Sequence, residues 1–222
     1  MIVVHHLENS RSQRILWFLE ELGIPYEVRR YPRDKKSQLA PPELKQVHPL
    51  GKSPVITDGA LTVAESGAIV EYLIDNYGKK KFRPAADTPE FFRYRYWMHA
   101  AEGSVMPLLV MKLVFLKTTQ PPVPFFIRPL TRAVAAEVGR SYIDPSIQAD
   151  LAYMERELGT STWFAGDELT GADILMSFPV EGAASRIDLG PFPKVRAFLD
   201  RVHARPAYQR ALERGGPYKI LG

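Results

Sequence analysis

Every stretch that is typical of a β-strand falls in the first third of this chain, and only helical patterns follow. The β-branched run Ile2 to His6 predicts a first strand, and the alternation from Tyr26 to Tyr31 predicts a second. Between them, apolar residues recur at helical spacing up to Leu22, and Gly23 is placed to end that helix. Two strands joined through a helix are usually parallel, so the chain is expected to open with a βαβ unit.

The stretch Gly51 to Leu73 reads GKSPVITDGALTVAESGAIVEYL and completes this first unit. A short helix near Pro42 to Val47 is expected before it. The stretch itself predicts a strand, a hairpin turn, a returning strand and an amphipathic helix, at Pro54 to Thr57, Asp58-Gly59, Ala60 to Val63 and Glu65 to Tyr77. The first 80 residues are therefore expected to form one small βαβαββα domain.

Gly78 to Thr88 is charged, contains proline and lacks periodicity, so it is predicted to be a linker. The helical patterns after it are Pro89 to Lys117, Arg132 to Leu158, Gly171 to Ser185, Lys194 to Ala204 and Pro206 to Arg214. Pro121 to Arg128 should form a loop, and Asp144-Pro145 is a possible break. Thr170 and Asp173 have the spacing of a capping box. The fold class is thus α/β plus all-α, with a helical domain over residues 89–222.

The composition excludes several functions. The 222 residues include no cysteine, so any thiol chemistry must use a thiol carried by a ligand. The five histidines lack metal-ligand spacing, and the net charge of +4 does not call for nucleic acid. The N-terminus lacks the pattern of a secretory signal, and the apolar stretch Val105 to Leu116 is too short for a membrane span. A soluble intracellular protein is expected.

Two polar pairs in the Gly51 to Leu73 stretch are candidate ligand contacts. If the Ser53–Pro54 peptide bond is cis, the main chain of Ser53 faces outward, where an extended peptide could pair with it; an ordinary trans proline at a strand start is the alternative. Ser66 begins a helix, where free N–H groups favour a ligand carboxylate, and Glu65 could face an ammonium group. Taken alone, Glu65 and Ser66 are better explained by a simple helix start, because both residue types favour the first turn.

The loop Asn9-Ser10-Arg11-Ser12 is a third candidate, because it joins the first strand to the first helix. It offers hydroxyls, an amide and helix N-terminal N–H groups, which are donors that stabilise an anion such as a thiolate. A cluster of helix-capping residues is the alternative interpretation of Ser10 and Ser12.

The order of these signals resembles the cytosolic glutathione transferases. The segments HHLENSRSQRILWFLEELGIPYEV, HPLGKSPVITD and TVAESGAIVEYL are similar to their thioredoxin-like N-terminal domain, and LTGADIL is similar to their C-terminal helical domain. The resemblance implies that Pro54 is a cis-proline and that Ser53 pairs with the cysteinyl part of glutathione. It implies that Glu65 and Ser66 hold the γ-glutamyl head group and that Lys52 meets the glycyl carboxylate.

The same resemblance places the residue that activates the sulfur in the Asn9 to Ser12 loop. That loop has neither the tyrosine nor the cysteine that many members use. Ser10 is the favoured donor to the sulfur, Asn9 is close behind, and Ser12 is third as a helix cap. Residues of the helix from Tyr94 to Lys117 would line the electrophile pocket beside Asn9 and Ser10.

The resemblance implies a cytoplasmic enzyme of detoxification that transfers glutathione to small apolar electrophiles and needs no metal. Glutathione-dependent peroxide or disulfide reduction is one alternative, and a glutathione-transferase-like binding module without turnover is another. A homodimer is expected, with the first domain of one protomer against the second domain of the other. No nucleic-acid partner is expected.

Overall fold

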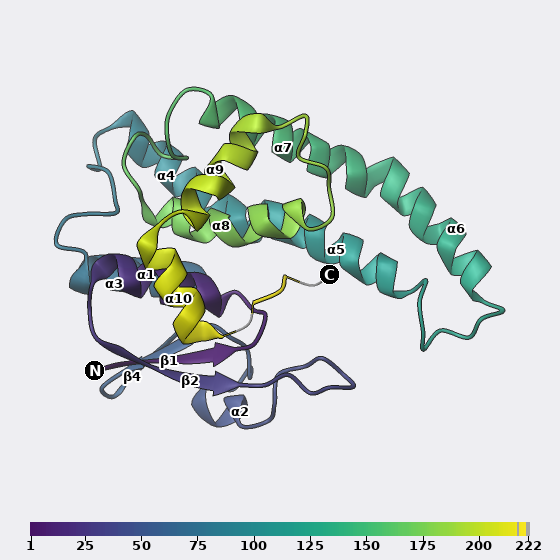
Figure 1. The fold of residues 1–222 in the computed structure, drawn as a ribbon, viewed down its shortest axis with the longest axis horizontal. Helices are drawn as coiled ribbons and strands as arrows, with labels where there is room; N and C mark the ends of the chain where they lie inside the picture. The colour runs from purple at the N-terminus through teal and green to yellow at the C-terminus, as the bar shows by residue number, and fades with distance from the viewer. Residues whose placement is uncertain (217, 221–222) are drawn as a thin grey trace.

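The computed structural model describes residues 1–216 and 218–220. Its N-terminal unit is built on a four-stranded mixed sheet with the strand order β2-β1-β3-β4 (Figure 1). β1 (Ile2–Leu7) runs parallel to β2 (Tyr26–Tyr31), as the connection through a helix predicts. β3 (Val55–Asp58) lies antiparallel to β1 and to β4 (Leu61–Ala64). All four strands lie within a residue or so of their predicted positions.

Three helices complete this unit. α1 (Ser12–Leu22) and α3 (Ser66–Tyr77) cover the sheet face that is turned toward the rest of the chain, and the short α2 (Leu44–Val47) lies on the opposite side (Figure 1). Gly23 has a φ of 64°, a left-handed conformation that suits glycine, and therefore ends α1 as predicted. The unit is βαβαββα, in agreement with the sequence.

The rest of the chain is helical. Its elements are α4 (Pro89–Ala100), η1 (Ala101–Val105), α5 (Met106–Lys117), α6 (Arg128–Val138), η2 (Gly139–Ile143), α7 (Asp144–Leu158), α8 (Gly171–Ala184), α9 (Pro193–His203) and α10 (Pro206–Gly215). The two η segments are π-helical turns, so α4 continues into α5 and α6 continues into α7 without a loop.

Two boundaries in this helical part differ from the sequence prediction. α6 begins at Arg128 rather than Arg132, because Pro129 fits the first turn of a helix. The possible break at Asp144-Pro145 is absent. The π turn ends just before Pro145, where a wider helix accommodates a residue that cannot donate a backbone hydrogen bond.

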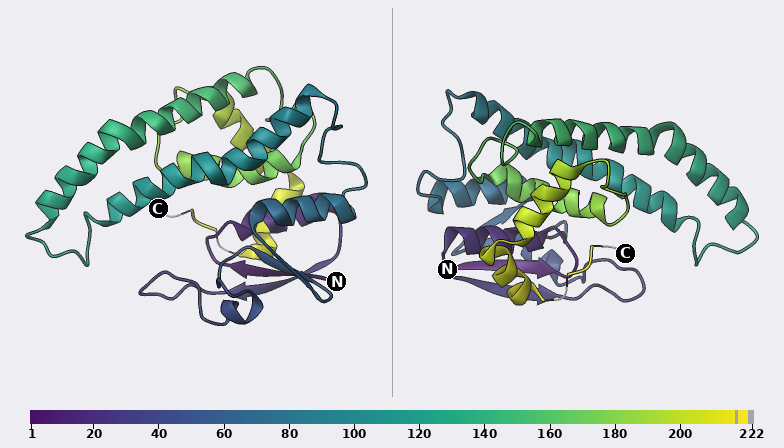
Figure 2. Two further views of the ribbon diagram at one scale, coloured as in Figure 1. Left: turned by 180° about the vertical axis from the view of Figure 1, so that it is seen from behind. Right: turned by 45° about the horizontal axis from the view of Figure 1, so that its top comes forward.

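α5 and α6 form a hairpin that projects beyond the other helices (Figures 1 and 2). Residues 118–127 form its tip, which includes a cis peptide bond between Pro121 and Pro122. Phe125 and Phe126 at this tip are 77% and 70% exposed. The predicted loop between helices is thus confirmed as the end of a long arm.

The helix that runs from Pro89 to Lys117 is, by length and composition alone, apolar enough to cross a membrane. Its first part nevertheless packs in the protein core, where Trp97 and Met98 are buried and α4 lies against α8. Of the apolar window within this helix, 28% is buried.

α8 is the centre of the molecule, because every residue from Gly171 to Ala183 is buried. It packs against α1, α3 and α4, so one apolar core extends through both structural units. Its start is the predicted capping box: the Thr170 N–H donates to Asp173 Oδ2 at 2.9 Å, and the Phe164 N–H donates to Asp173 Oδ1 at 2.8 Å. Burial raises the pKa of Asp173 to about 6.

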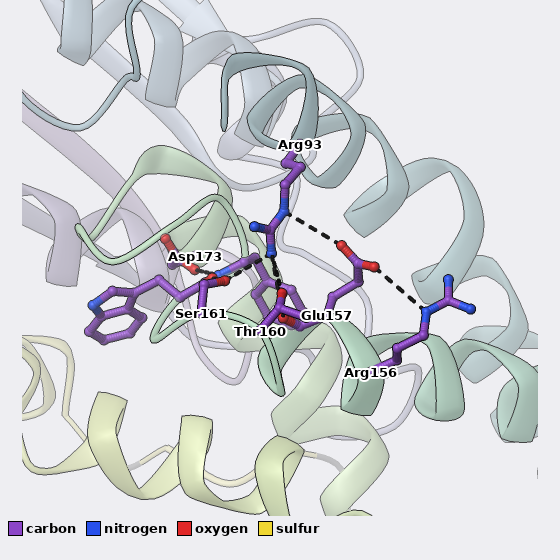
Figure 3. A network of polar contacts seen from close by, with 8 residues as sticks. Arg93, Arg156, Glu157, Thr160, Ser161 and Asp173 are labelled. Carbon is purple, nitrogen blue, oxygen red and sulfur yellow. Dashed lines mark hydrogen bonds and ion pairs between the residues drawn. The ribbon is translucent and has the colours of Figure 1, made fainter. Parts of the chain in front are cut away.

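The loop before α8 is also tied to α4 (Figure 3). The guanidinium of Arg93 donates to Ser161 Oγ at 2.8 Å and lies 3.5 Å from the carboxylate of Glu157. Asp173 lies on the other side of the same loop. This network fixes the start of α8, and α8 in turn positions α1 at the edge of the candidate site.

Candidate active site at the edge of the sheet

The strand register brings the three candidate segments to one edge of the sheet. Val55 pairs with His5 on one side and with Ala64 on the other. Ser53-Pro54 therefore lies between the end of β1 and the Glu65-Ser66 step that follows β4. The loop from Asn9 to Ser12 follows β1 at the same edge.

Ser53 precedes a cis peptide bond to Pro54, as the resemblance implies. Its hydroxyl donates to the carbonyl of His5 at 2.8 Å and accepts the Leu7 N–H at 3.3 Å. Because Pro54 cannot donate, this side chain replaces the next pair of the β1–β3 ladder. Among the described residues, nothing bonds the backbone N–H or carbonyl of Ser53. These two groups are therefore available to an extended ligand.

Ser66 is the first residue of α3 and is only 3% exposed, and its hydroxyl has no hydrogen-bond partner in the described part of the chain. Glu65 before it has a φ of 71°, which is rare for a residue other than glycine. Its exposed carboxylate stands beside the helix N-terminus rather than capping it. Backbone strain of this kind often occurs where a ligand is held. Lys52 is exposed two residues before Pro54.

Ser10 and Ser12 belong to a buried chain of hydrogen bonds that ends on His6. The hydroxyls of Ser10 and Ser12 are 2.8 Å apart, and the Ser12 hydroxyl lies 2.8 Å from Nδ1 of His6. Burial lowers the pKa of His6 to about 4, so the ring is neutral at neutral pH. The backbone of Gly215 lies against the ring and acts on this pKa in the opposite direction to burial.

The Ser12 hydroxyl is the centre of these contacts. It lies within hydrogen-bond distance of His6 Nδ1 and of Ser10 Oγ, and it can donate to the carbonyl of Leu7 at 3.4 Å. Ser10 Oγ also accepts the Ser12 N–H at 3.2 Å. The hydroxyl of Ser10, the favoured sulfur donor, is thus engaged by Ser12 in a residue that is only 5% exposed. The role predicted for Ser12 as a cap is wrong, because Arg11 is the N-cap, no side chain caps α1, and the Ser12 hydroxyl bonds His6.

Asn9 has a φ of 49° and is half-buried. Its Oδ1 accepts the backbone N–H of Lys219 at 2.7 Å, which fixes the amide and leaves Nδ2 as a donor. The chain at Lys219 is held in turn by Tyr218, whose hydroxyl donates to Oε2 of Glu181 on α8 at 2.8 Å. The C-terminal segment thus lies over the loop, a contact that the sequence did not predict.

Arg11, Arg14 and Glu102 form an ion cluster where α1 begins. Arg11 Nε lies 2.9 Å from Glu102 Oε2, and Arg14 pairs with Oε1 of the same carboxylate. Burial alone would raise the pKa of Glu102, but the two guanidinium groups outweigh it and hold the pKa below its usual value. Two cations against one anion leave a net positive charge beside the N-terminus of α1. This positive charge and the N-terminus of α1 both stabilise an anion in the loop.

Sequence reasoning missed the Glu102 cluster. The signal for it was available, because Glu102 is the only acidic residue between Glu90 and Glu137. The π turn η1 carries it, and such turns occur frequently at functional sites.

The predicted electrophile-pocket helix is only partly available to a ligand. Tyr94 and Trp97 are 1% exposed and belong to the core, so the first turns of Tyr94 to Lys117 cannot line a pocket. Past Glu102, the half-buried Leu108 and Met111 lie on one face of α5. As for metals, no group of three or more His, Asp or Glu side chains in the described ranges is arranged to hold an ion.

Comparisons with known proteins agree with this arrangement. The family "Glutathione S-transferase, N-terminal domain" matches residues 1–75, and the "Glutathione S-transferase, C-terminal domain" matches residues 141–206. Glutathione S-transferase 3 of Schizosaccharomyces pombe is 37% identical over 96% of this chain and 88% of its own length. Glutathione S-transferase 1 of Saccharomyces cerevisiae is 32% identical over 96% of this chain and 95% of its own length.

A solved structure is also similar. The crystal structure of a glutathione S-transferase from Actinobacillus pleuropneumoniae superposes with a TM-score of 0.77 and 33% identity, over 97% of this chain and 93% of that one. Its agreement covers the thioredoxin-like unit and the helical unit together. The chain therefore belongs to the glutathione S-transferase family and has the transferase activity of that family.

Proposed function

We propose that Asn9 activates the sulfur of glutathione and that Ser10 and Ser12 hold the loop in position. The sequence favours Ser10 for this role, but the contacts of the buried Ser10 hydroxyl with Ser12 support Asn9 instead. The Asn9 amide is oriented by the Lys219 N–H and keeps its Nδ2 donor. The net positive charge of the Arg11–Arg14–Glu102 cluster also favours the thiolate form of glutathione.

The reaction requires only a modest lowering of the thiol pKa. A free thiol has a pKa of about 8.5 and is mostly protonated at neutral pH. One amide donor and a helix N-terminus are expected to lower the thiol pKa by about one to two units. Each pKa unit corresponds to about 1.4 kcal/mol of thiolate stabilisation. The proton leaves to solvent, and the thiolate attacks an electrophilic carbon. With an aryl halide, a carbon–sulfur bond forms and halide departs with the electron pair of the broken bond.

Glutathione is proposed to lie along the edge of the sheet. The free backbone of Ser53 pairs with the cysteinyl residue beside cis Pro54. The Ser66 hydroxyl and N–H receive the γ-glutamyl carboxylate, and Glu65 receives its ammonium group. Lys52 meets the glycyl carboxylate. The observation that carries this proposal is the juxtaposition of unpartnered groups on Ser53 and Ser66 at the edge where the Asn9 loop begins.

Two matched substitutions in one loop test the proposal. The ultraviolet absorbance of enzyme-bound thiolate, titrated against pH, reports the pKa of the glutathione thiol directly. We expect Asn9→Ala to raise this pKa by about one unit and to lower kcat about tenfold. Ser10→Ala should leave the thiol pKa unchanged, and Ser66→Ala should weaken glutathione binding without moving the thiol pKa. A raised thiol pKa in Ser10→Ala with none in Asn9→Ala would reject the assignment.

The proposed co-substrates are small apolar electrophiles that reach the sulfur along Leu108 and Met111 of α5. The names of the relatives support conjugation over peroxide or disulfide reduction and over a module without turnover. Conjugation of an aryl halide and reduction of a hydroperoxide, measured side by side, separate these activities. Faster turnover of the hydroperoxide would favour reduction. A cytoplasmic location and a role in detoxification belong to the same proposal, as does the division into domains 1–80 and 89–222.

A homodimer is proposed in which the exposed face of the Pro89 to Lys117 helix, in the second domain, lies against the first domain of the other protomer. Exposed apolar residues four positions apart occur as two pairs on this helix, Phe92 with Tyr96 and Val110 with Val114, and each is 40% exposed or more. A second copy that buries this face would remove a large apolar surface from water. Light scattering should report a dimer for the wild type and a monomer for Val110→Glu. A monomeric wild type would contradict the proposal.

A further inference from the structure

A buried carboxylate on α8 holds the C-terminal segment that lies over the Asn9 loop. Glu181 is only 8% exposed, although α8 is the core helix of the protein. Its Oε2 accepts from the hydroxyl of Tyr218 at 2.8 Å, and its Oε1 accepts from the hydroxyl of Tyr208 and lies 2.9 Å from Nε2 of His203. A buried carboxylate is costly unless its oxygens are hydrogen-bonded, so the fold favours the state in which all three contacts are made.

The segment 218–220 depends on this carboxylate for its position. Among the described residues, the segment makes no backbone–backbone hydrogen bond. Within the same ranges, its two hydrogen bonds run from the Tyr218 hydroxyl to Glu181 and from the Lys219 N–H to Oδ1 of Asn9. A cavity of about 360 Å³ lies beside the segment, between Tyr218 and residues of α8 and α10, so side-chain packing supports the segment only in part.

The two hydrogen bonds of this segment are coupled, because Tyr218 and Lys219 are consecutive residues. The bond to Asn9 fixes Oδ1 of the amide and thereby directs Nδ2, the donor proposed for the glutathione sulfur. Hydrogen bonds weaken steeply when the donor is misaligned. A segment that is released at Tyr218 would therefore leave the Asn9 amide free to turn away from the sulfur.

We propose that Tyr218, anchored by Glu181, is a positioning residue for the transferase reaction, because it holds the segment whose Lys219 N–H orients the Asn9 amide. This inference rests on the proposed role of Asn9. Burial and the neighbouring Glu181 carboxylate raise the pKa of the Tyr218 hydroxyl well above its ordinary value. The hydroxyl therefore stays protonated, and continues to donate to Glu181, over the pH range in which the thiol of glutathione titrates.

Tyr218→Phe and Tyr208→Phe form a matched pair for the test. Each substitution removes one hydroxyl from the same carboxylate, and neither changes a charge, but only Tyr218 belongs to the segment that reaches Asn9. The ultraviolet absorbance of bound thiolate, titrated against pH, should show a thiol pKa raised by about half a unit in Tyr218→Phe and unchanged in Tyr208→Phe. An unchanged thiol pKa in Tyr218→Phe, or an equal rise in both variants, would overturn the inference.

The same titration in the Asn9→Ala background separates this inference from the proposed role of Asn9. Adding Tyr218→Phe to Asn9→Ala should raise the thiol pKa no further, because the amide that the segment orients is already gone. A further rise of about half a unit in the double variant would contradict the path through Asn9. A rise in Asn9→Ala without one in Tyr218→Phe would reject the positioning role alone. No rise in Asn9→Ala would reject both proposals together.

Discussion

Lowering the pH is expected to destabilise the protein through His6. This residue is 2% exposed, and burial lowers its pKa to about 4. Unfolding returns the ring to water, where its pKa is about 6.5. Between these two values the unfolded chain binds a proton that the folded chain does not, so the free energy of unfolding falls with pH. The contribution of His6 is complete above about pH 6.5 and is lost as the pH falls toward 4.

Between about pH 7.5 and pH 5, protonation of His6 in the unfolded chain lowers the free energy of unfolding by about 2 kcal/mol. Asp173 acts in the opposite sense over this range, because its pKa is raised to about 6 by burial and its protonated form is favoured in the fold. The substitution His6→Asn isolates the histidine. It keeps an acceptor for the Ser12 hydroxyl and leaves Asp173 untouched, so the contribution of Asp173 cancels when the two proteins are compared.

Urea unfolding, followed by tryptophan fluorescence at one protein concentration, measures both free energies. The stability advantage of the wild type over His6→Asn should shrink by about 2 kcal/mol between about pH 7.5 and pH 5. His99 lies exposed on α4, so His99→Asn serves as the control for the loss of a histidine. An advantage of the same size at both pH values would refute the account of a buried, neutral His6.

Three further outcomes are expected. Asp173→Ala should lower the free energy of unfolding by about 3 kcal/mol in a urea titration, since two buried N–H donors lose their acceptor, and Asp173→Asn should lower it less. Glu102→Gln should cost about 3 kcal/mol in the same assay, because it leaves Arg14 buried without its anion, and it should also lower the pKa of bound glutathione. Tyr218→Phe should release the segment over Asn9, so the Lys219 amide should exchange about tenfold faster with deuterium.

The fold could be predicted from sequence because its determinants are local. The strand alternation, the turn at Gly59 and the capping box of Asp173 each act within a few residues. The juxtaposition of Ser53 and Ser66 also followed, because the hairpin that fixes their register is short. Local periodicity could not predict that α6 continues through η2, since Pro145 looks like a break unless the wider π turn is known.

The choice between Ser10 and Asn9 depends on contacts that no local pattern contains. The Ser10 hydroxyl contacts Ser12, Ser12 contacts the ring of His6, and that ring lies against Gly215 far along the chain. Asn9 is oriented by Lys219, which lies 210 residues away in sequence. Both contacts form only when the end of the helical unit packs back onto α1 and the first strand.

The Arg11–Arg14–Glu102 cluster connects this packing to the chemistry. Arg14 is buried and also donates to the carbonyl of Leu175 at 2.5 Å, so the same guanidinium holds α1 against α8 and against the π turn that carries Glu102. A buried charge is costly unless it is fully paired, so this arrangement persists only while the two units are docked. The net positive charge that stabilises a thiolate is thus a property of the docked state. Changes that loosen the contact between the units should therefore shift the thiol pKa even where they touch neither glutathione nor Asn9.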